Sequence, residues 1–438
     1  MSAKEVAKMT TDPRINGICF TGSTGVAQLI YRSAASALEP DSTFIAETGG
    51  LNAMIVDSSA LPEQAVRDIV DSAFRSCGQR CSALRMLYLQ KDIADDFLTM
   101  LYGAMDELEV SDSKKMSSDV GPVITSTARQ EILDHIAVAR SEEKLLKQLD
   151  APTSGFFIGP AVIAVDGIQS LEKEIFGPVL HITTFDAMDI DKIVEDINAS
   201  GYGLTFGLHT RIDDRVQHIT SKLNVGNIYV NRNQIGAVVG SQPFGGEGLS
   251  GTGPKAGGPH YVKRFKRLSR PEHEIITGDG VDIRAVQSAL DNAITNSHSA
   301  LESVDMPGPT GESNRWSVFA RGTILCLGPS SEDAMRQMAM AAESGCNSIG
   351  IAPGLSGTNT FSGYLDRAAL SELHGFEAVA LWSNLDDLKS ARTALAQRNG
   401  ALIPLIASDD MRDSCVLERH LCIDTTAAGG NASLLAAQ

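Results

Sequence analysis

The feature that most constrains the fold is the alternation of short apolar strands with helices along most of the 438 residues. Residues 15–21 read as a buried strand, residues 26–38 as a helix and residues 43–46 as a second strand. This βαβ order is typical of a parallel sheet whose two faces are covered by helices. We therefore predict an α/β fold, with the strands that should precede residue 15 absent or supplied by another chain.

Mixed α/β patterning continues from residue 62 to residue 260. A glycine-rich stretch, residues 236–259, cannot be regular throughout, and so much glycine permits close approach of the backbone to a ligand. The predicted helices are 62–76, 91–107, 126–149, 189–198 and 211–222, after a short helix at 2–9. The predicted strands are 84–89, 156–164, 178–184, 204–209 and 227–231.

A polar connector, residues 263–315, separates this region from a second βαβαβ pattern. The connector is expected to contain one helix, residues 283–303. The predicted order beyond it is strand 318–327, helix 331–343, strand 347–352, helix 363–374, strand 376–382, helix 384–398 and strand 401–407. The composition of residues 425–434 is that of a flexible tail.

Charge and composition exclude several classes of protein. The net charge of −17, with no basic stripe to offset it, argues against a nucleic-acid partner. Seven cysteines are an odd number in a long chain, which favours reduced thiols in a cytoplasm. No apolar run approaches the roughly 20 residues of a transmembrane segment, and the N-terminus lacks a signal-peptide core. We expect a soluble cytoplasmic protein.

Cys81 is the candidate nucleophile, because it lies between a predicted helix and strand and follows Arg80, which could lower the pKa of its thiol. A buried, inert cysteine is the alternative. Cys77 lies four residues earlier, but no cluster of histidines or cysteines supports a metal site, and we predict none. The remaining cysteines are expected in the core: Cys19, Cys326, Cys346, Cys415 and Cys422.

Three further positions could serve a site. Glu47 ends a predicted strand just before Gly49-Gly50, where a carboxylate could act as a general base, although a surface glutamate is the simpler interpretation. Gly22-Ser23 joins a strand to a helix, which suits either a phosphate or an ordinary N-cap. Glu174 and Phe176 could face one pocket, or could simply end a helix.

Taken in order along the chain, several short motifs resemble the aldehyde dehydrogenase superfamily. The spacing of 34 positions from Glu47 to Cys81 also matches that superfamily. The motifs are Phe20-Thr-Gly-Ser-Thr24, Glu47-Thr-Gly-Gly50, Gly78-Gln-Arg-Cys81, Glu174-Ile-Phe-Gly-Pro178, Pro243-Phe-Gly-Gly246 and Ser250-Gly-Thr252.

Other segments resemble particular groups within this superfamily. Residues 242–261 are similar to the glutamate-semialdehyde branch of the superfamily. Residues 307–312, 318–407 and 426–434 resemble the C-terminal part of the bacterial proline utilization A family. The resemblance implies a partial aldehyde dehydrogenase fold followed by a second Rossmann-like domain. Its implied domains are the remnant of an NAD-binding domain (1–46), a catalytic domain with a substrate-anchor loop (47–262), a linker (263–315) and a C-terminal α/β domain (316–438).

The resemblance implies NAD-dependent oxidation of glutamate γ-semialdehyde to glutamate, as in proline catabolism. Cys81 would form a thiohemiacetal, and Glu47 would activate the water that releases the product. The implied cofactor contacts are Gly22 and Ser23 to the pyrophosphate, Thr48 and Gly49 beside the nicotinamide, Glu174 to the ribose and Phe176 to the nicotinamide ring. The implied substrate contacts are Ser82, Gly236 and Ala237 to the α-carboxylate and Phe244 along the aldehyde tunnel.

The sequence also departs from the family pattern. Gly25 stands where relatives usually have an acidic residue. The upstream half of the dinucleotide domain, with its oxyanion-donating asparagine, is missing, and such a donor is typically worth ~10²–10³ in rate. We therefore expect a truncated chain that binds NAD weakly unless a homo-oligomer or a complementing upstream half, the proline dehydrogenase part, completes it. The alternative is a catalytically incompetent assembly or lid module.

Overall fold

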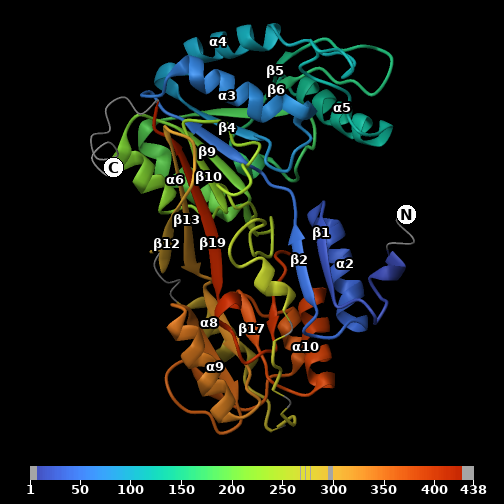
Figure 1. Cartoon of the computed structure of the whole chain (residues 1–438), viewed down its shortest axis with the longest axis vertical. Helices are drawn as coiled ribbons and strands as arrows, with labels where there is room; N and C mark the ends of the chain where they lie inside the picture. The colour runs from blue at the N-terminus through green and yellow to red at the C-terminus, as the bar shows by residue number, and fades with distance from the viewer. Residues whose placement is uncertain (1–6, 267, 272, 277, 294–298, 427–438) are drawn as a thin grey trace. The chain divides into compact units, whose positions relative to one another are not determined.

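The computed structural model describes residues 7–266, 268–271, 273–276, 278–293 and 299–426 (Figure 1). The chain forms two compact units. Unit 1 comprises Met1–Thr48, Gly248–Val304 and Ser317–Arg419, and unit 2 comprises Gly49–Glu247, Asp305–Trp316 and His420–Gln438. The structure confirms the predicted α/β class, because both units contain parallel strands covered by helices.

The central strands of unit 2 belong to a ten-stranded sheet with the order β12-β13-β19-β10-β9-β3-β4-β7-β6-β5. Six consecutive pairs from β19 to β6 are parallel, and β5 pairs antiparallel with β6. The bounds are β3 Ala53–Val56, β4 Met86–Gln90, β5 Leu145–Gln148, β6 Ala161–Ala164, β7 Val179–Phe185, β9 Thr205–His209, β10 Asn227–Val230, β12 Glu302–Met306, β13 Glu312–Ala320 and β19 Val416–Asp424. Two short strands, β8 Tyr202–Gly203 and β11 Glu247–Gly248, complete this region.

Both faces of this sheet are buried, which explains the continuous apolar runs of its central strands. In β3, Met54 and Val56 face one core, whereas Ala53 and Ile55 face the other. The first core contains α3 Pro62–Phe74, α4 Ala94–Asp106 and α5 Ser126–Ser141, and the second contains α6 Ile190–Ala199 and α7 Asp213–Thr220. Figure 1 shows α3 and α4 above the sheet and α6 below it.

Unit 1 begins with the predicted βαβ element. β1 Gly17–Thr21 and β2 Thr43–Glu47 are parallel neighbours, and α2 Thr24–Ala37 connects them. Ser23 caps α2 by accepting a hydrogen bond from the amide of Val26 at 3.4 Å. The helix packs on the C-terminal part of the same unit, where Ala396 joins its apolar cluster.

The C-terminal part of unit 1 is a doubly wound sheet. Its five parallel strands have the order β16-β15-β14-β17-β18, which in chain order is 3-2-1-4-5, as in Rossmann-like folds. Helices pack on it in two separate cores. The bounds are β14 Thr323–Cys326, β15 Asn347–Ala352, β16 Thr360–Ser362, β17 Ala378–Ala380, β18 Leu405–Ile406, α8 Ile283–Asp291, α9 Ser331–Glu343 and α10 Leu385–Gln397.

Several predicted elements are wrong. The helix predicted over 126–149 ends at Ser141, because Glu143 adopts a left-handed φ of 58° and the chain turns into β5. The strand predicted over 318–327 is two strands, β13 and β14, separated at Gly322, whose φ is 125°. The helix predicted over 363–374 is reduced to a 3-10 turn, Arg367–Ser371, which Asp366 caps.

Other predictions were incomplete. The helix expected over 283–303 ends at Asp291, and β12 occupies residues 302–306 of the predicted connector. Strands β3 and β19 were missed. The helix at 2–9 lies mostly outside the described residues, although 7–9 are helical, and most of the tail, 427–434, also lies outside them.

All seven cysteines carry reduced thiols. The expectation that Cys19 is a core residue is wrong: it is exposed on β1, whose side chains alternate between exposed and half-buried positions. In the part of the chain that the structure describes, no helix is long and apolar enough to cross a membrane.

Asp68 on α3 is a buried carboxyl that carries a stability cost. Asp68 is 2% exposed, and burial raises the pKa of its carboxyl group from 3.8 to about 6. Because the folded pKa lies above the unfolded value, protonated Asp68 is tolerated at low pH, and stability is lost as the pH rises from about 4 to 6. We predict that Asp68→Asn raises the free energy of unfolding by about 1–3 kcal/mol at pH 8. Thermal melts from pH 4 to pH 8 should show this advantage shrinking below pH 6.

Asp71→Asn, a half-buried position on the same helix, is the matched control. If Asp68→Asn lowered stability at pH 8, the carboxylate would instead be a needed partner for Arg67 at 3.4 Å or His209 at 3.8 Å.

Candidate functional site

The turn that precedes Cys81 is strained. Ser76 and Cys77 both have left-handed backbone conformations, with φ of 55° and 56°, and Gly78 follows with φ of 63°. Such conformations cost about 1–3 kcal/mol for each non-glycine residue and cluster at functional sites. Cys77 is buried, and burial raises its pKa to about 12, whereas Cys81 is half-buried. Of the two thiols in this turn, Cys81 is therefore the accessible one.

Gly78 brings this turn against the segment that carries Glu174 and Phe176. A Cβ atom at Gly78 would lie 2.1 Å from the carbonyl oxygen of Gly177, so no other residue fits without moving that backbone. The predicted nucleophile and the predicted cofactor segment are therefore neighbours within unit 2.

Arg85 forms hydrogen bonds with both of these segments. This residue is 1% exposed. Its guanidinium donates to Glu174 Oε1 at 2.9 and 3.2 Å, to the Gly177 carbonyl at 3.1 Å and to the Arg80 carbonyl at 3.2 Å. It also lies 5.4 Å from the ring centre of Phe176. A single buried cation therefore positions the cysteine turn, the carboxylate and the aromatic ring.

The carboxylate of Glu174 lies against the backbone of Gly49 and Gly50. A Cβ atom at Gly49 would lie 1.9 Å from Glu174 Oε2, so only glycine allows this approach. Burial raises the pKa of Glu174, and Arg85 and the Gly50 amide oppose that effect. Its side chain is 15% exposed, and the Phe176 residue beside it is 43% exposed. A mostly buried carboxylate and a more exposed aromatic ring thus lie near each other in unit 2.

Asn52 fixes the backbone around Cys81 and was not predicted. Its amide nitrogen donates to the carbonyls of Cys81 at 2.7 Å and Ala83 at 2.9 Å, and its amide oxygen accepts from the Thr205 amide at 3.1 Å. The signal that could have identified it is a polar residue bordering the buried run of β3. Arg85 likewise stands at the start of an apolar run, where an unpaired charge would be costly.

Two of the predicted substrate-anchor residues, Ser82 and Gly236, lie close to the cysteine turn. Gly236, with φ of 73°, lies beside Arg80, whose Nη1 would be 3.7 Å from a Cβ at that glycine. Ser82 is buried, and its carbonyl accepts from Thr205 Oγ1 at 3.2 Å. Ala237 is half-buried next to Gly236.

Phe244 is half-buried in a segment that Asn227 clamps. The Asn227 amide donates to the Pro243 carbonyl at 2.9 Å and accepts from the Gly245 amide at 3.2 Å. The conformation of the Pro-Phe-Gly motif is therefore set by one buried asparagine of β10.

The remaining predicted residues lie in unit 1, where Glu47 and Thr48 contact residues 249–252. Glu47 forms an antiparallel bridge with Gly251, and its carbonyl accepts from the Gly22 amide at 3.1 Å. Thr48 donates its hydroxyl to the Leu249 carbonyl at 2.6 Å. Ser23, as the N-cap of α2, has its hydroxyl beside the first helical amides. Gly22, Ser23, Glu47 and Thr48 thus lie together at the C-terminal ends of the neighbouring strands β1 and β2.

Within the described ranges, no three histidine, cysteine, aspartate or glutamate side chains are grouped as a metal site would require. The chemistry available in unit 2 is that of an accessible thiol next to an acid and an aromatic ring.

Comparison with known families shows which family the chain belongs to. Residues 2–269 match the aldehyde dehydrogenase family. The chain belongs to that family. The match covers more than half of the sequence and contains every residue predicted for the site, so family membership and the α/β fold rest on the whole region rather than on one motif.

Individual relatives agree. The chain is 40% identical to the bifunctional protein PutA of Escherichia coli over 98% of its own length and 36% of that protein. It is 39% identical to a 1-pyrroline-5-carboxylate dehydrogenase of Geobacillus over 60% of its length and 52% of that enzyme. The chain thus spans about a third of the PutA relative and about half of the dehydrogenase.

Solved structures show the same likeness. A bifunctional proline utilization A protein superposes with a TM-score of 0.59 at 49% identity, covering 60% of this chain and 27% of that one. A Thermus 1-pyrroline-5-carboxylate dehydrogenase with bound NAD gives a TM-score of 0.55 at 33% identity, covering 59% and 51%.

The buried pair of Arg85 and Glu174 generates a stability prediction. Arg85→Met should lower the free energy of unfolding of unit 2 by about 3–5 kcal/mol, because it leaves the Glu174 carboxylate buried without its cation. The double variant Arg85→Met/Glu174→Leu should recover much of that loss. Urea denaturation of both variants, with Arg284→Met at an exposed site as the control, measures the difference. A double variant no more stable than the single one would contradict this electrostatic explanation.

Proposed function

We propose that this chain is the aldehyde-oxidising part of a proline-catabolic enzyme and converts glutamate γ-semialdehyde to glutamate with NAD⁺. The observation that carries the proposal is Arg85, a buried cation that holds the Cys81 turn beside Glu174 and Phe176. The relatives named for 1-pyrroline-5-carboxylate dehydrogenase support the substrate, since that compound is the cyclic form of the semialdehyde.

Cys81 is proposed as the nucleophile. Its thiolate attacks the aldehyde carbon to form a thiohemiacetal, and loss of hydride from that carbon leaves a thioester on the cysteine. The strained turn and the hydrogen bond from Asn52 to the Cys81 carbonyl fix the backbone from which the sulfur must attack. The accessible position of Cys81 compared with Cys77 supports this role.

The residues present fit NAD, which supplies the hydride acceptor when bound. Glu174 retains acceptor capacity for the ribose hydroxyls, because a carboxylate offers about four lone-pair sites and Arg85 occupies one of its oxygens. Phe176 would pack against the nicotinamide with its exposed ring. Gly22 and Ser23 would meet the pyrophosphate at the N-terminus of α2, and Thr48 and Gly49 would line the nicotinamide end.

Glu47 is proposed as the general base. Its carboxylate would take a proton from the water that attacks the Cys81 thioester, and the products are glutamate and the regenerated thiol. The backbone bridges from Gly22 and Gly251 hold Glu47 at the end of β2, where the extended strand gives way to Thr48 and the two glycines.

The substrate has a fixed anion, the α-carboxylate, that backbone amides and hydroxyls can bind. We assign this role to Ser82, Gly236 and Ala237, because Gly236 lies beside the Arg80 side chain next to the nucleophile. Phe244 would line the path of the aldehyde chain. The left-handed conformation of Gly236 suits a loop whose amides converge on an anion.

The setting of the reaction is also part of the proposal. The relatives called bifunctional support a second activity, proline dehydrogenase, supplied by a complementing part, and we include homo-oligomerisation as the other way to complete the site. The seven reduced cysteines favour a cytoplasmic location. We keep the domain limits 1–46, 47–262, 263–315 and 316–438 as proposals. A non-catalytic assembly or lid module is the rival function.

Replacing the nucleophile tests the reaction. Cys81→Ala should abolish NADH formation from glutamate γ-semialdehyde, while Cys77→Ala, four residues away and buried, should retain most of it. Iodoacetamide at pH 7.5 followed by peptide mass mapping should modify Cys81 much faster than Cys77. Turnover by Cys81→Ala within tenfold of the parent would remove Cys81 from this role, and an unreactive Cys81 would favour the assembly module.

Replacing the base separates the two chemical steps. Glu47→Gln should slow thioester hydrolysis more than hydride loss, because only hydrolysis needs a proton acceptor for water. Stopped-flow absorbance should therefore show a burst of NADH followed by turnover reduced at least a hundredfold, whereas Glu274→Gln at an exposed site should behave like the parent. Equal loss in the burst and the steady state would indicate a structural role for Glu47.

A further inference from the structure

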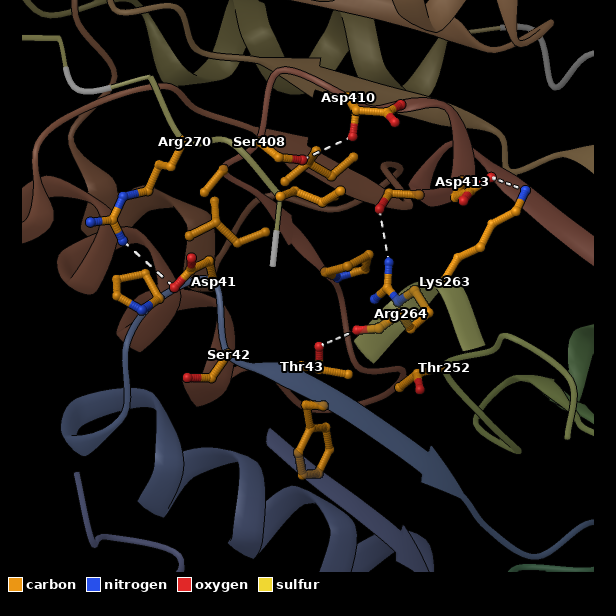
Figure 2. A pocket seen from close by; sticks show the side chains of 18 of the residues that line it. Asp41, Ser42, Thr43, Thr252, Lys263, Arg264, Arg270, Ser408, Asp410 and Asp413 are labelled. Carbon is orange, nitrogen blue, oxygen red and sulfur yellow. Dashed lines mark hydrogen bonds and ion pairs between the residues drawn. The ribbon is translucent and has the colours of Figure 1, made fainter. Parts of the chain in front are cut away.

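A cavity of about 900 Å³ lies within unit 1, and none of the residues that line it is among those proposed for the dehydrogenase site (Figure 2). Residues 39–44, 263–266 and 402–408 supply most of its wall. Its volume falls within the range of small-molecule sites, about 300–1,000 Å³. The cavity is therefore large enough for a ligand of roughly ten or more non-hydrogen atoms.

Arg264 presents unused hydrogen-bond donors to this cavity. Among the described residues, its guanidinium donates one hydrogen bond, from Nη1 to Ser414 Oγ at 2.9 Å. A guanidinium has five N–H groups, so most of the donors of Arg264 are available to a ligand or to water. The residue is half-buried, and desolvation together with the nearby Arg321 lowers the pKa of Arg264. An anion placed here would relieve that unfavourable environment.

Arg321 converges on the same point. It donates from Nε to the carbonyl of Ser414 at 2.7 Å and from Nη2 to the carbonyl of Val416 at 3.2 Å. Two arginines and one serine hydroxyl thus gather at one end of the cavity. Planar guanidinium groups match the geometry of a carboxylate or a phosphate.

The charge balance of the wall limits the charge of the ligand. Seven cationic and five acidic side chains line the cavity, which leaves two positive charges in excess. Figure 2 shows that Arg270 reaches Asp41 on one side and Lys263 reaches Asp413 on the other. Because Asp413 lies near Arg264, it offsets one of the two positive charges at the arginine end of the cavity, and a singly charged anion suits that end better than a dianion.

An apolar wall accompanies the charged end. Tyr31 and Phe44, whose rings are 5.2 Å apart, and the side chains of Leu402 and Ile403 line the cavity. Tyr31 is fixed by its hydroxyl, which donates to the Ile403 carbonyl at 3.2 Å. A ligand with an apolar body would bury part of that body against these residues, at roughly 25 cal/mol for each Å².

We propose that this cavity is a second ligand site, which binds an organic monocarboxylate with an apolar body. The carboxylate contacts Arg264, Arg321 and the Ser414 hydroxyl. The body packs against Tyr31 and Phe44. The protein as a whole has a net charge of −17 and repels anions, so saturable binding of one requires a local site of this kind.

Calorimetric titration of the 438-residue chain with hexanoate tests the proposal. Acetate, which has the head without the body, and 1-hexanol, which has the body without the charge, are the ligand controls. Hexanoate should bind at one site at least tenfold more tightly than either control, and more weakly as salt is added. Equal affinity for hexanoate and acetate, or the absence of saturable hexanoate binding, would overturn the proposal.

Two variants locate the binding. Arg264→Gln should weaken hexanoate binding at least tenfold, whereas Arg284→Gln, an exposed arginine of the same unit, should leave it unchanged. Ser42→Trp, which places a ring in the cavity, should block binding without removing a charge, and melting curves confirm that each variant is folded. If hexanoate bound to Arg264→Gln and to Ser42→Trp as tightly as to the parent chain, its site would lie elsewhere, for example in the dehydrogenase site. That result would refute this assignment.

Discussion

The buried ion pair between Arg85 and Glu174 is the interaction on which the proposed site most depends. Both groups lose hydration, and the cost is offset because the guanidinium meets a carboxylate and two backbone carbonyls at once. Arg85 joins the turn before Cys81 to the segment after Glu174, which approach so closely at Gly78 that a side chain would not fit. Loss of the pair would therefore disturb the proposed nucleophile and the proposed cofactor segment together.

The ten-stranded sheet makes such a buried cation tolerable. Its central strands are apolar on both faces, so the cores above and below it leave little room for movement of β3 and β4. Two polar residues, Asn52 before β3 and Arg85 before β4, are held in place by these strands and hydrogen-bond to the backbone of the neighbouring loops. This is the usual division of labour in α/β proteins, in which the sheet is rigid and the loops at strand ends carry chemistry.

The five-stranded, doubly wound sheet of unit 1 differs from the ten-stranded sheet, because, among the described residues, its strand ends do not present a comparable site. Ligands of such sheets bind at the switch point, which here lies between β14 and β17. The Gln337 side chain occupies that position: its amide donates to the Gly328 carbonyl at 2.9 Å and accepts from the Gly328 amide at 3.0 Å. Trp382 is fully buried beside it. The Gly328 amide, which could otherwise bind a phosphate, is therefore satisfied within the protein, and the cavity of unit 1 lies elsewhere.

The sequence alone determined the α/β class, the family and the identities of the proposed catalytic residues, because strand and helix periodicity and ordered motifs are local properties of the chain. It predicted α9 and β15 to the residue, where a capping box and a short apolar run mark the ends. It failed at residues 142–148, where antiparallel pairing with β6 overrides a helical pattern. Only the tertiary structure revealed Asn52, Arg85 and the Arg264 cavity, because most of their partners are 29 to 153 residues away and no local pattern records such contacts.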